Sequence, residues 1–93
     1  MQKKHFEWRI ERNLLAPILT LTCEADDNKI EWLILKQAVK VIEVAEKDFK
    51  GKSLNAGFPK STKNLCVSFS IKFQSDIAVS GFTKIIPNIL SSA

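Results

Sequence analysis

The sequence predicts one small α+β domain over residues 1–93, a two-layer sandwich in which an antiparallel sheet of about four strands packs on one main helix. Two observations carry this prediction. Apolar and polar residues alternate in three segments, which is typical of strands with one buried face, and one long segment has the apolar spacing of a helix. The expected order is strand, strand, helix, loop, strand, strand, with a short C-terminal helix as a further element. The length is enough for one hydrophobic core and too short for two domains.

Residues 5–12 and 18–25 predict the first two strands. In the first segment charged residues separate the apolar ones, which are Phe6, Trp8 and Ile10. In the second, leucines alternate with threonines, as expected for a half-buried strand. A helix is the alternative for residues 5–12, because some of their apolar residues also stand four apart.

The register of these two strands is expected to follow from their apolar faces. Phe6, Trp8 and Ile10 must face the same side as the leucines of the second strand, because a slip of one residue would turn the leucines to water. The pattern therefore predicts Glu7 opposite Thr22, Arg9 opposite Thr20, and His5 opposite Glu24.

Residues 29–50 have helical spacing, with Gly51 placed to end the helix. The expected buried face consists of Ile30, Ile34, Ala38, Val41, Ile42, Ala45 and Phe49. Trp32 and Leu33 fall off this face. Two alternatives therefore stay open: a helix from 29 whose first turn is nearly surrounded, or a strand over 29–35 and a helix that begins near residue 37.

Residues 65–74 predict the clearest strand, because apolar and polar residues alternate along all of it. Cys66 falls on its polar face, whereas Cys23 faces inward on its own strand. Residues 77–82 are predicted as a short returning strand. Apolar pairs four residues apart predict a short helix over 85–90.

Residues 51–63 predict a flexible basic loop. The net charge of +4 arises between residues 47 and 63, which carry five lysines and one aspartate, whereas residues 1–46 have a net charge of −1. Lysines can track a phosphate backbone, and an aromatic ring can stack on a base. The candidate nucleic-acid contacts are Lys47, Lys50, Lys52, Phe58, Lys60 and Lys63.

The sequence contains no assembled catalytic constellation. The triplet Gly51-Lys52-Ser53 lacks the other glycine of a phosphate-binding loop, and it follows a helix instead of preceding one. His5 is the only histidine, and two cysteines are too few for a zinc site. Both thiols are expected to be reduced, and whether Cys66 is reactive stays open. We therefore expect no enzyme, cofactor, metal or small-molecule substrate.

Protein binding is the leading functional hypothesis. A strand edge at 77–82 with little charge invites strand addition, and the apolar residues after it are able to dock on a partner. The candidate protein-interface residues are Ile77, Val79, Phe82, Ile85, Ile86, Ile89 and Leu90. The expected role is a small adaptor, inhibitor or regulatory subunit that binds another protein or a second copy of itself. Nucleic-acid binding through 47–63 is the alternative. No apolar run is long enough to span a membrane, so a cytoplasmic location is expected.

Overall fold

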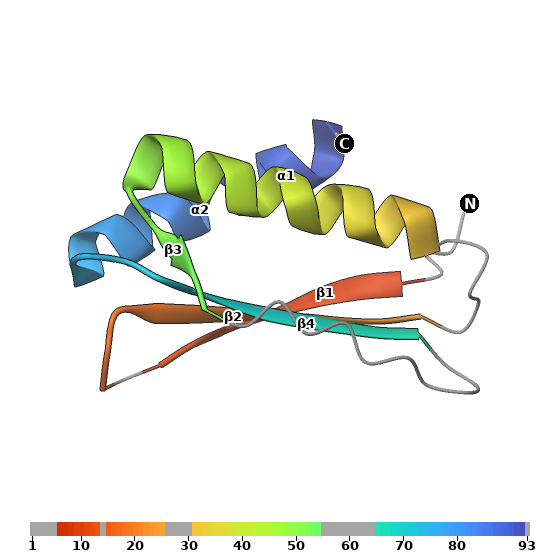
Figure 1. Ribbon diagram of the computed structural model, residues 1–93, viewed down its shortest axis with the longest axis horizontal. Coiled ribbons are helices and arrows are strands. Elements are labelled where there is room, and N and C mark those ends of the chain that lie inside the picture. The colour runs from red at the N-terminus through yellow and green to blue at the C-terminus, as the bar shows by residue number, and fades with distance from the viewer. Residues whose placement is uncertain (1–5, 14, 26–30, 55–64, 93) are drawn as a thin grey trace.

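A computed structural model describes residues 6–13, 15–25, 31–54 and 65–92, and it confirms the α+β sandwich (Figure 1). The elements in chain order are β1 (Phe6–Arg12), β2 (Ile18–Ala25), α1 (Glu31–Phe49), β3 (Lys52–Ser53), β4 (Leu65–Lys72) and α2 (Asp76–Ser92). The four strands form one antiparallel sheet in the order β1-β2-β4-β3. Both helices lie on the same face of this sheet (Figure 1).

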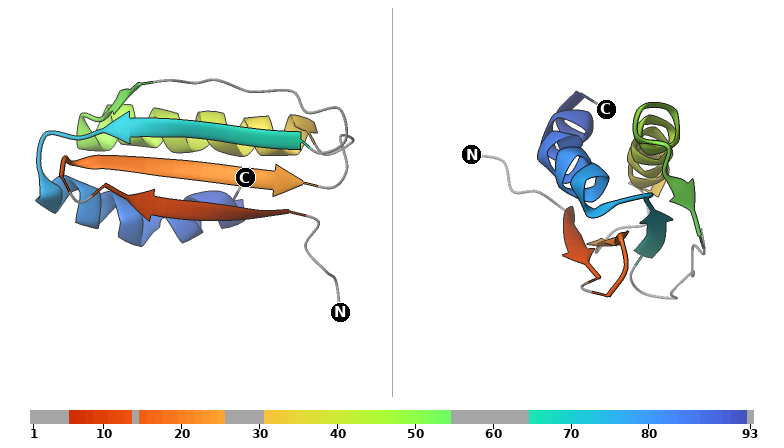
Figure 2. Two further views of the ribbon diagram at one scale, coloured as in Figure 1. Left: turned by 90° about the horizontal axis from the view of Figure 1, so that it is seen from below. Right: turned by 90° about the vertical axis from the view of Figure 1, so that its left-hand side faces the viewer.

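The chain consists of two successive strand-strand-helix units, and their central strands β2 and β4 lie side by side. Each helix packs on strands of the other unit. The helix α1 follows β2 but contacts β4 and β3, whereas α2 follows β4 and lies along β1 (Figure 2). Each helix therefore covers strands that belong to the other unit.

The predicted register between the first two strands is wrong by two residues, although the predicted faces are confirmed. Glu7 lies opposite Glu24, and Arg9 lies opposite Thr22. His5 lies outside the described residues. A shift of two residues leaves every side chain on the same face, so the apolar pattern could not distinguish the two registers.

The core lies between the sheet and the two helices. Its buried residues are Leu19, Leu21, Ala38, Val41, Ala45, Phe69, Ile71, Phe73, Val79, Phe82, Ile86 and Ile89, and a second cluster adds Cys23, Ala25, Ile34 and Val67. Gln37 is the one polar side chain buried among the described residues. It accepts a hydrogen bond from the Trp8 indole N–H (2.8 Å) and donates one to the Leu90 carbonyl (3.2 Å), so it links β1, α1 and α2.

The predicted strand at 77–82 is wrong, because these residues belong to α2. Val79, Phe82, Ile86 and Ile89 fall on one face of this helix and are buried together. Pro87 lies inside it, and the Ser75 hydroxyl accepts a hydrogen bond from the Ala78 amide (3.2 Å) at its start. The predicted short helix at 85–90 is the second half of α2. The fourth strand of the sheet is instead β3, within the predicted loop at 51–63.

The helix α1 is already formed at Glu31, so a strand over 29–35 followed by a helix from about 37 is wrong. Residues 26–30 lie outside the described residues. At the other end Lys50 has the left-handed φ of 53°, and the Gly51 amide donates to the Ala45 carbonyl (2.8 Å). These two residues turn the chain sharply from α1 into β3. Neither described helix is long and apolar enough to cross a membrane.

Candidate functional site

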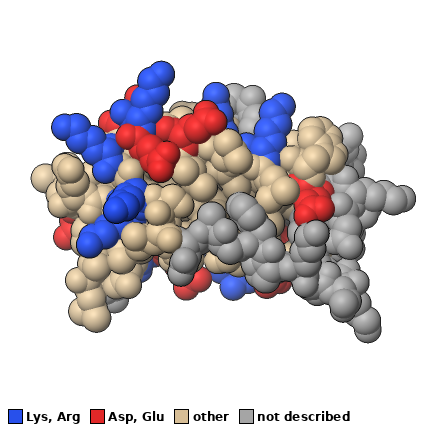
Figure 3. Space-filling view, in the orientation of Figure 1, with Lys and Arg blue, Asp and Glu red and all other residues tan. Residues whose placement is uncertain are grey.

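The candidate nucleic-acid residues are only partly described. Phe58, Lys60 and Lys63 lie outside the described residues. The other three, Lys47, Lys50 and Lys52, are exposed around the C-terminal end of α1. In this region acidic side chains stand among the basic ones (Figure 3), and Glu46 and Asp48 are exposed beside Lys47. Among the described residues of this region, the mixed charges form no continuous cationic track for a phosphate backbone.

Most of the candidate protein-interface residues are part of the core. Val79, Phe82, Ile86 and Ile89 are buried, and Ile85 and Leu90 are half-buried against the same cluster. Ile77 alone is open to water, with 85% of its surface exposed. The structure therefore does not bring these seven residues together as one accessible surface.

The sheet face opposite the helices is polar. Its residues lie in rows across the strands: Glu7, Glu24 and Cys66; Arg9, Thr22 and Ser68; Glu11, Thr20 and Ser70; and Ile18, Lys72 and Lys52. In the middle rows the Thr20 and Ser70 hydroxyls are 2.9 Å apart, and those of Thr22 and Ser68 are 3.3 Å apart. These hydroxyl groups satisfy each other across β2 and β4, and the charges lie toward the rim.

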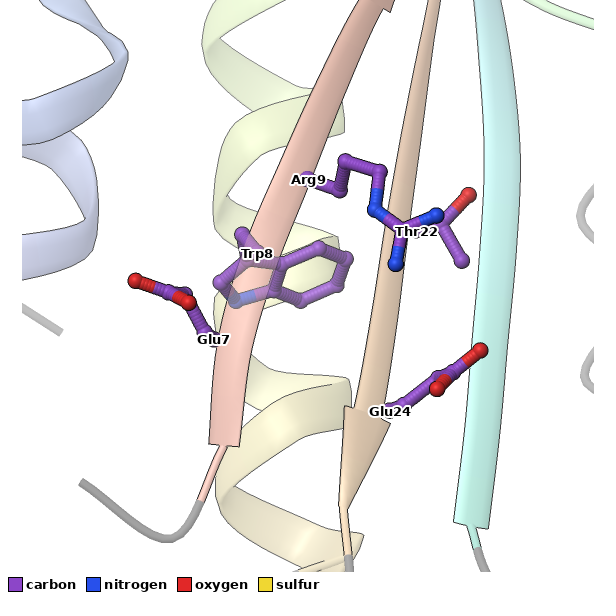
Figure 4. Close-up of a pocket in the computed structure, with 5 residues that line it drawn as sticks. All are labelled: Glu7, Trp8, Arg9, Thr22 and Glu24. Carbon is purple, nitrogen blue, oxygen red and sulfur yellow. The ribbon is translucent and has the colours of Figure 1, made fainter.

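A shallow hollow of about 240 Å³ lies on this face and is lined by Glu7, Trp8, Arg9, Thr22 and Glu24 (Figure 4). Arg9 reaches across β2 toward Thr22, and Glu24 extends toward β4, whereas Glu7 points to the outer side of β1 (Figure 4). The two carboxylates, although opposite in register, therefore point apart. They do not form a close carboxylate pair.

The two cysteines lie on opposite faces of the sheet, as their alternating positions predicted, and both are free thiols. Cys66 is half-buried in the outermost row of the polar face. Cys23 is fully buried beneath α1, and this burial raises the pKa of its thiol from 9.0 to about 11. Because the thiolate is the nucleophile, Cys23 is suited to packing and not to thiol chemistry near neutral pH.

The raised pKa of Cys23 predicts a loss of stability at alkaline pH. The folded state holds this proton up to about pH 11, whereas the unfolded chain releases it above about pH 9. The free energy of unfolding should therefore fall as the pH rises from about 9 toward about 11. Below that range Cys23 should not make the free energy of unfolding depend on pH. Urea denaturation of the wild type and of Cys23→Ala at several pH values checks this. Equal slopes for both proteins between pH 9 and pH 11 would contradict it.

The outward side of α1 carries an apolar stripe that we define as Trp32, Leu35 and Val39. Trp32 is 65% exposed and Val39 is 51% exposed, whereas Leu35 is partly buried against Val67 and its neighbours. The spacing i, i+3, i+7 aligns the three side chains along one side of the helix. Trp32 lay off the predicted core face, and this was the signal in the sequence for an exposed site.

Among the residues that the structure describes, no group of three His, Cys, Asp or Glu side chains is placed to hold a metal ion. Comparisons with protein-family models, with curated proteins and with solved structures found no match.

Proposed function

We propose that this chain is a small protein-binding module that contacts its partner through the outer stripe, Trp32, Leu35 and Val39. The observation that carries the proposal is the 65% exposure of Trp32 on a helix that already buries its other face in the core. Exposed tryptophan is costly to hydrate and is enriched among the residues that contribute most to protein interfaces. The proposal keeps protein binding and moves it from the C-terminal residues to α1.

The spacing of the stripe fits a helix that lies in a groove of another protein. Anchors at i, i+3 and i+7 are the pattern by which one helix fills such a groove. Two flanking lysines, Lys36 and Lys40, are exposed on one side of the stripe. A fitting partner therefore presents an apolar groove with an acidic rim on that side, because opposite charges around an apolar centre favour association.

Truncation of Trp32 tests this proposal. Partners are first cross-linked from cell extract through a photoreactive residue at Val39 of the full chain, and each candidate is then purified. Trp32→Ala should weaken binding of the purified partner by about 30-fold or more, the loss typical of an interface hot spot. The stability of Trp32→Ala should stay within about 0.5 kcal/mol of the wild type, because the side chain is mostly exposed.

Glu43→Ala is the matched control, since Glu43 is also exposed on the outer side of α1 and lies one turn beyond Val39. Its affinity for the partner should stay within about twofold of the wild type, as for other rim residues. Equal binding by the wild type and Trp32→Ala would overturn the proposal.

A further inference from the structure

The strand β1 has a free outer edge whose hydrogen-bonding groups can be assigned. It lies at the end of the sheet, and no described residue pairs with its outer side. The Asn13 amide donates to the Ile18 carbonyl (3.0 Å) where the hairpin turns. Because hydrogen-bonded pairs alternate along an antiparallel ladder, Glu11, Arg9 and Glu7 also bond to β2. The backbone N–H and C=O groups of Trp8, Ile10 and Arg12 therefore point outward.

The side chains along this edge complement a second copy of themselves. When two β1 edges pair antiparallel about a two-fold axis through Ile10, Arg9 of each copy lies opposite Glu11 of the other. Opposite charges that face each other across strands are stabilising, and like charges there are destabilising. An axis through Arg9 would instead place Arg9 opposite itself and Glu7 opposite Glu11. The alternation of charge along β1 therefore favours an axis through an uncharged residue, Trp8 or Ile10, over an axis through Arg9.

The opposite face of the edge also favours the axis through Ile10. Ile10 shares the helix side of the sheet with Leu21, which is fully buried, yet Ile10 is itself 36% exposed. In the paired edges Ile10 of one copy lies against Ile10 of the other, which removes apolar surface from water. Trp8 then lies opposite Arg12 of the second copy, an arrangement that allows a guanidinium to stack on an indole ring.

The helix α2 lies over β1 on the side of the sheet that Ile10 faces (Figure 2). Arg12 forms an ion pair with Asp76 (3.2 Å) and donates to the Ser80 hydroxyl (3.3 Å), so this flank of α2 faces β1. Thr83 and Pro87 continue the same flank at i+3 and i+7 from Ser80 and are exposed. These side chains are short or compact, and in paired edges they face the same flank of the second copy.

We propose that two copies of this chain form a dimer through their β1 edges, antiparallel about a two-fold axis through Ile10, with one sheet continuous across both copies. This axis keeps the helices of both copies on the same side of the joined sheet, because residues that lie opposite each other share a face. The surface differs from the outer stripe of α1. The dimer therefore leaves that stripe accessible for another protein, and the two proposals are independent.

Charge exchange at Arg9 and Glu11 tests the pairing. Sedimentation equilibrium of the full chain should show a monomer–dimer equilibrium. Arg9→Glu and Glu11→Arg should each raise the dimer dissociation constant about tenfold or more, because each change turns two attractive contacts into repulsive ones. The double variant Arg9→Glu/Glu11→Arg should return the constant to near the wild-type value. Both side chains are exposed, so the circular dichroism of the variants should stay native.

Two comparisons make the result specific. Lys40→Glu carries the same charge change as Arg9→Glu on the outer side of α1, and it should leave the dimer unchanged. In the dimer the outward amides of Ile10 and Arg12 should gain protection from hydrogen exchange, and dilution should remove it. A wild-type chain that stays monomeric, or single variants that dimerise like the wild type, would overturn the proposal. If the double variant Glu7→Arg/Arg9→Glu dimerised like the wild type and Arg9→Glu/Glu11→Arg did not, Glu7 would lie opposite Arg9. This result would overturn the axis through Ile10.

Discussion

Replacing Phe82 by alanine should lower the free energy of unfolding by about 3–5 kcal/mol, the usual cost of removing a phenyl ring from a core. Phe82 has no exposed surface. Its ring packs edge-on against Phe49 (centroids 5.3 Å apart) and at a tilt against Phe73 (5.3 Å). The truncation would therefore leave a cavity where α2 meets the end of α1 and the strand end of β4. Urea denaturation followed by circular dichroism measures the loss.

Ile77 provides the matched comparison on the same helix. Five residues before Phe82, it is 85% exposed, so Ile77→Ala should change stability by less than about 0.5 kcal/mol. The sequence instead predicted a strand edge at 77–82 with Phe82 as a binding residue. In that arrangement Phe82 would be exposed, and Phe82→Ala would change the free energy of unfolding only a little. A loss below about 1 kcal/mol for Phe82→Ala, smaller than core truncations produce, would thus contradict the position of this side chain in the core.

Gly51→Ala should destabilise the fold by about 1–3 kcal/mol, because the added methyl group has no space. A Cβ atom at position 51 would lie 2.8 Å from the Ile71 Cγ2 atom and 3.2 Å from the Phe73 ring. Ile71 is fully buried on β4, so it cannot easily move away. Alanine restricts the unfolded chain more than glycine does, which offsets the loss by about 0.4–1 kcal/mol. Thermal unfolding measured by calorimetry tests the net effect.

A glycine at the preceding position, Lys50→Gly, should stabilise the fold. Lys50 has a φ of 53°, a conformation that costs a residue with a Cβ atom about 1 kcal/mol and costs glycine nothing. Lys50→Gly should therefore raise stability by up to about 1 kcal/mol, although part of this gain is lost to the greater freedom of the unfolded chain. If Gly51→Ala were as stable as the wild type, the close approach of α1, β3 and β4 at this turn would be disproved.

The strand faces could be predicted from the sequence because burial on one side imposes a period of two. Cys23 and Cys66 were placed on opposite faces for this reason, and the structure confirms it. The register of the first hairpin could not be predicted in the same way. A shift by two residues preserves both faces, and the choice depends on the hydrogen bond between Asn13 and Ile18 at the turn.

The segment at 77–82 was misread because its pattern is short. Ile77 and Val79 stand two residues apart, which indicated a strand, but the longer series Val79, Phe82, Ile86 and Ile89 has helical spacing. Pro87 lies among these residues, and proline is disfavoured in helix interiors. Its position inside α2 shows that tertiary packing outweighs this preference here.

The candidate surface followed from the same misreading. Residues of the C-terminal segment were expected to bind a partner because they were apolar and were predicted to lie at an edge, yet all of them except Ile77 pack in or against the core. Trp32, in contrast, fell outside the buried face that the sequence predicted for the helix over 29–50. The structure places its side chain mostly in water, and the proposed binding surface rests on this exposure.

The packing of each helix on strands of the other unit has a consequence for how the chain folds. A cut between α1 and β3 would leave two strand-strand-helix fragments, each without some of the strands on which its own helix packs in the intact domain. Neither fragment should hold a stable structure alone, and mixing them should reconstitute the domain. Folding of the intact chain has to bring together β2 and β4, where Thr20 meets Ser70 across 50 residues of sequence. The domain should therefore fold slowly for its size and as one cooperative unit.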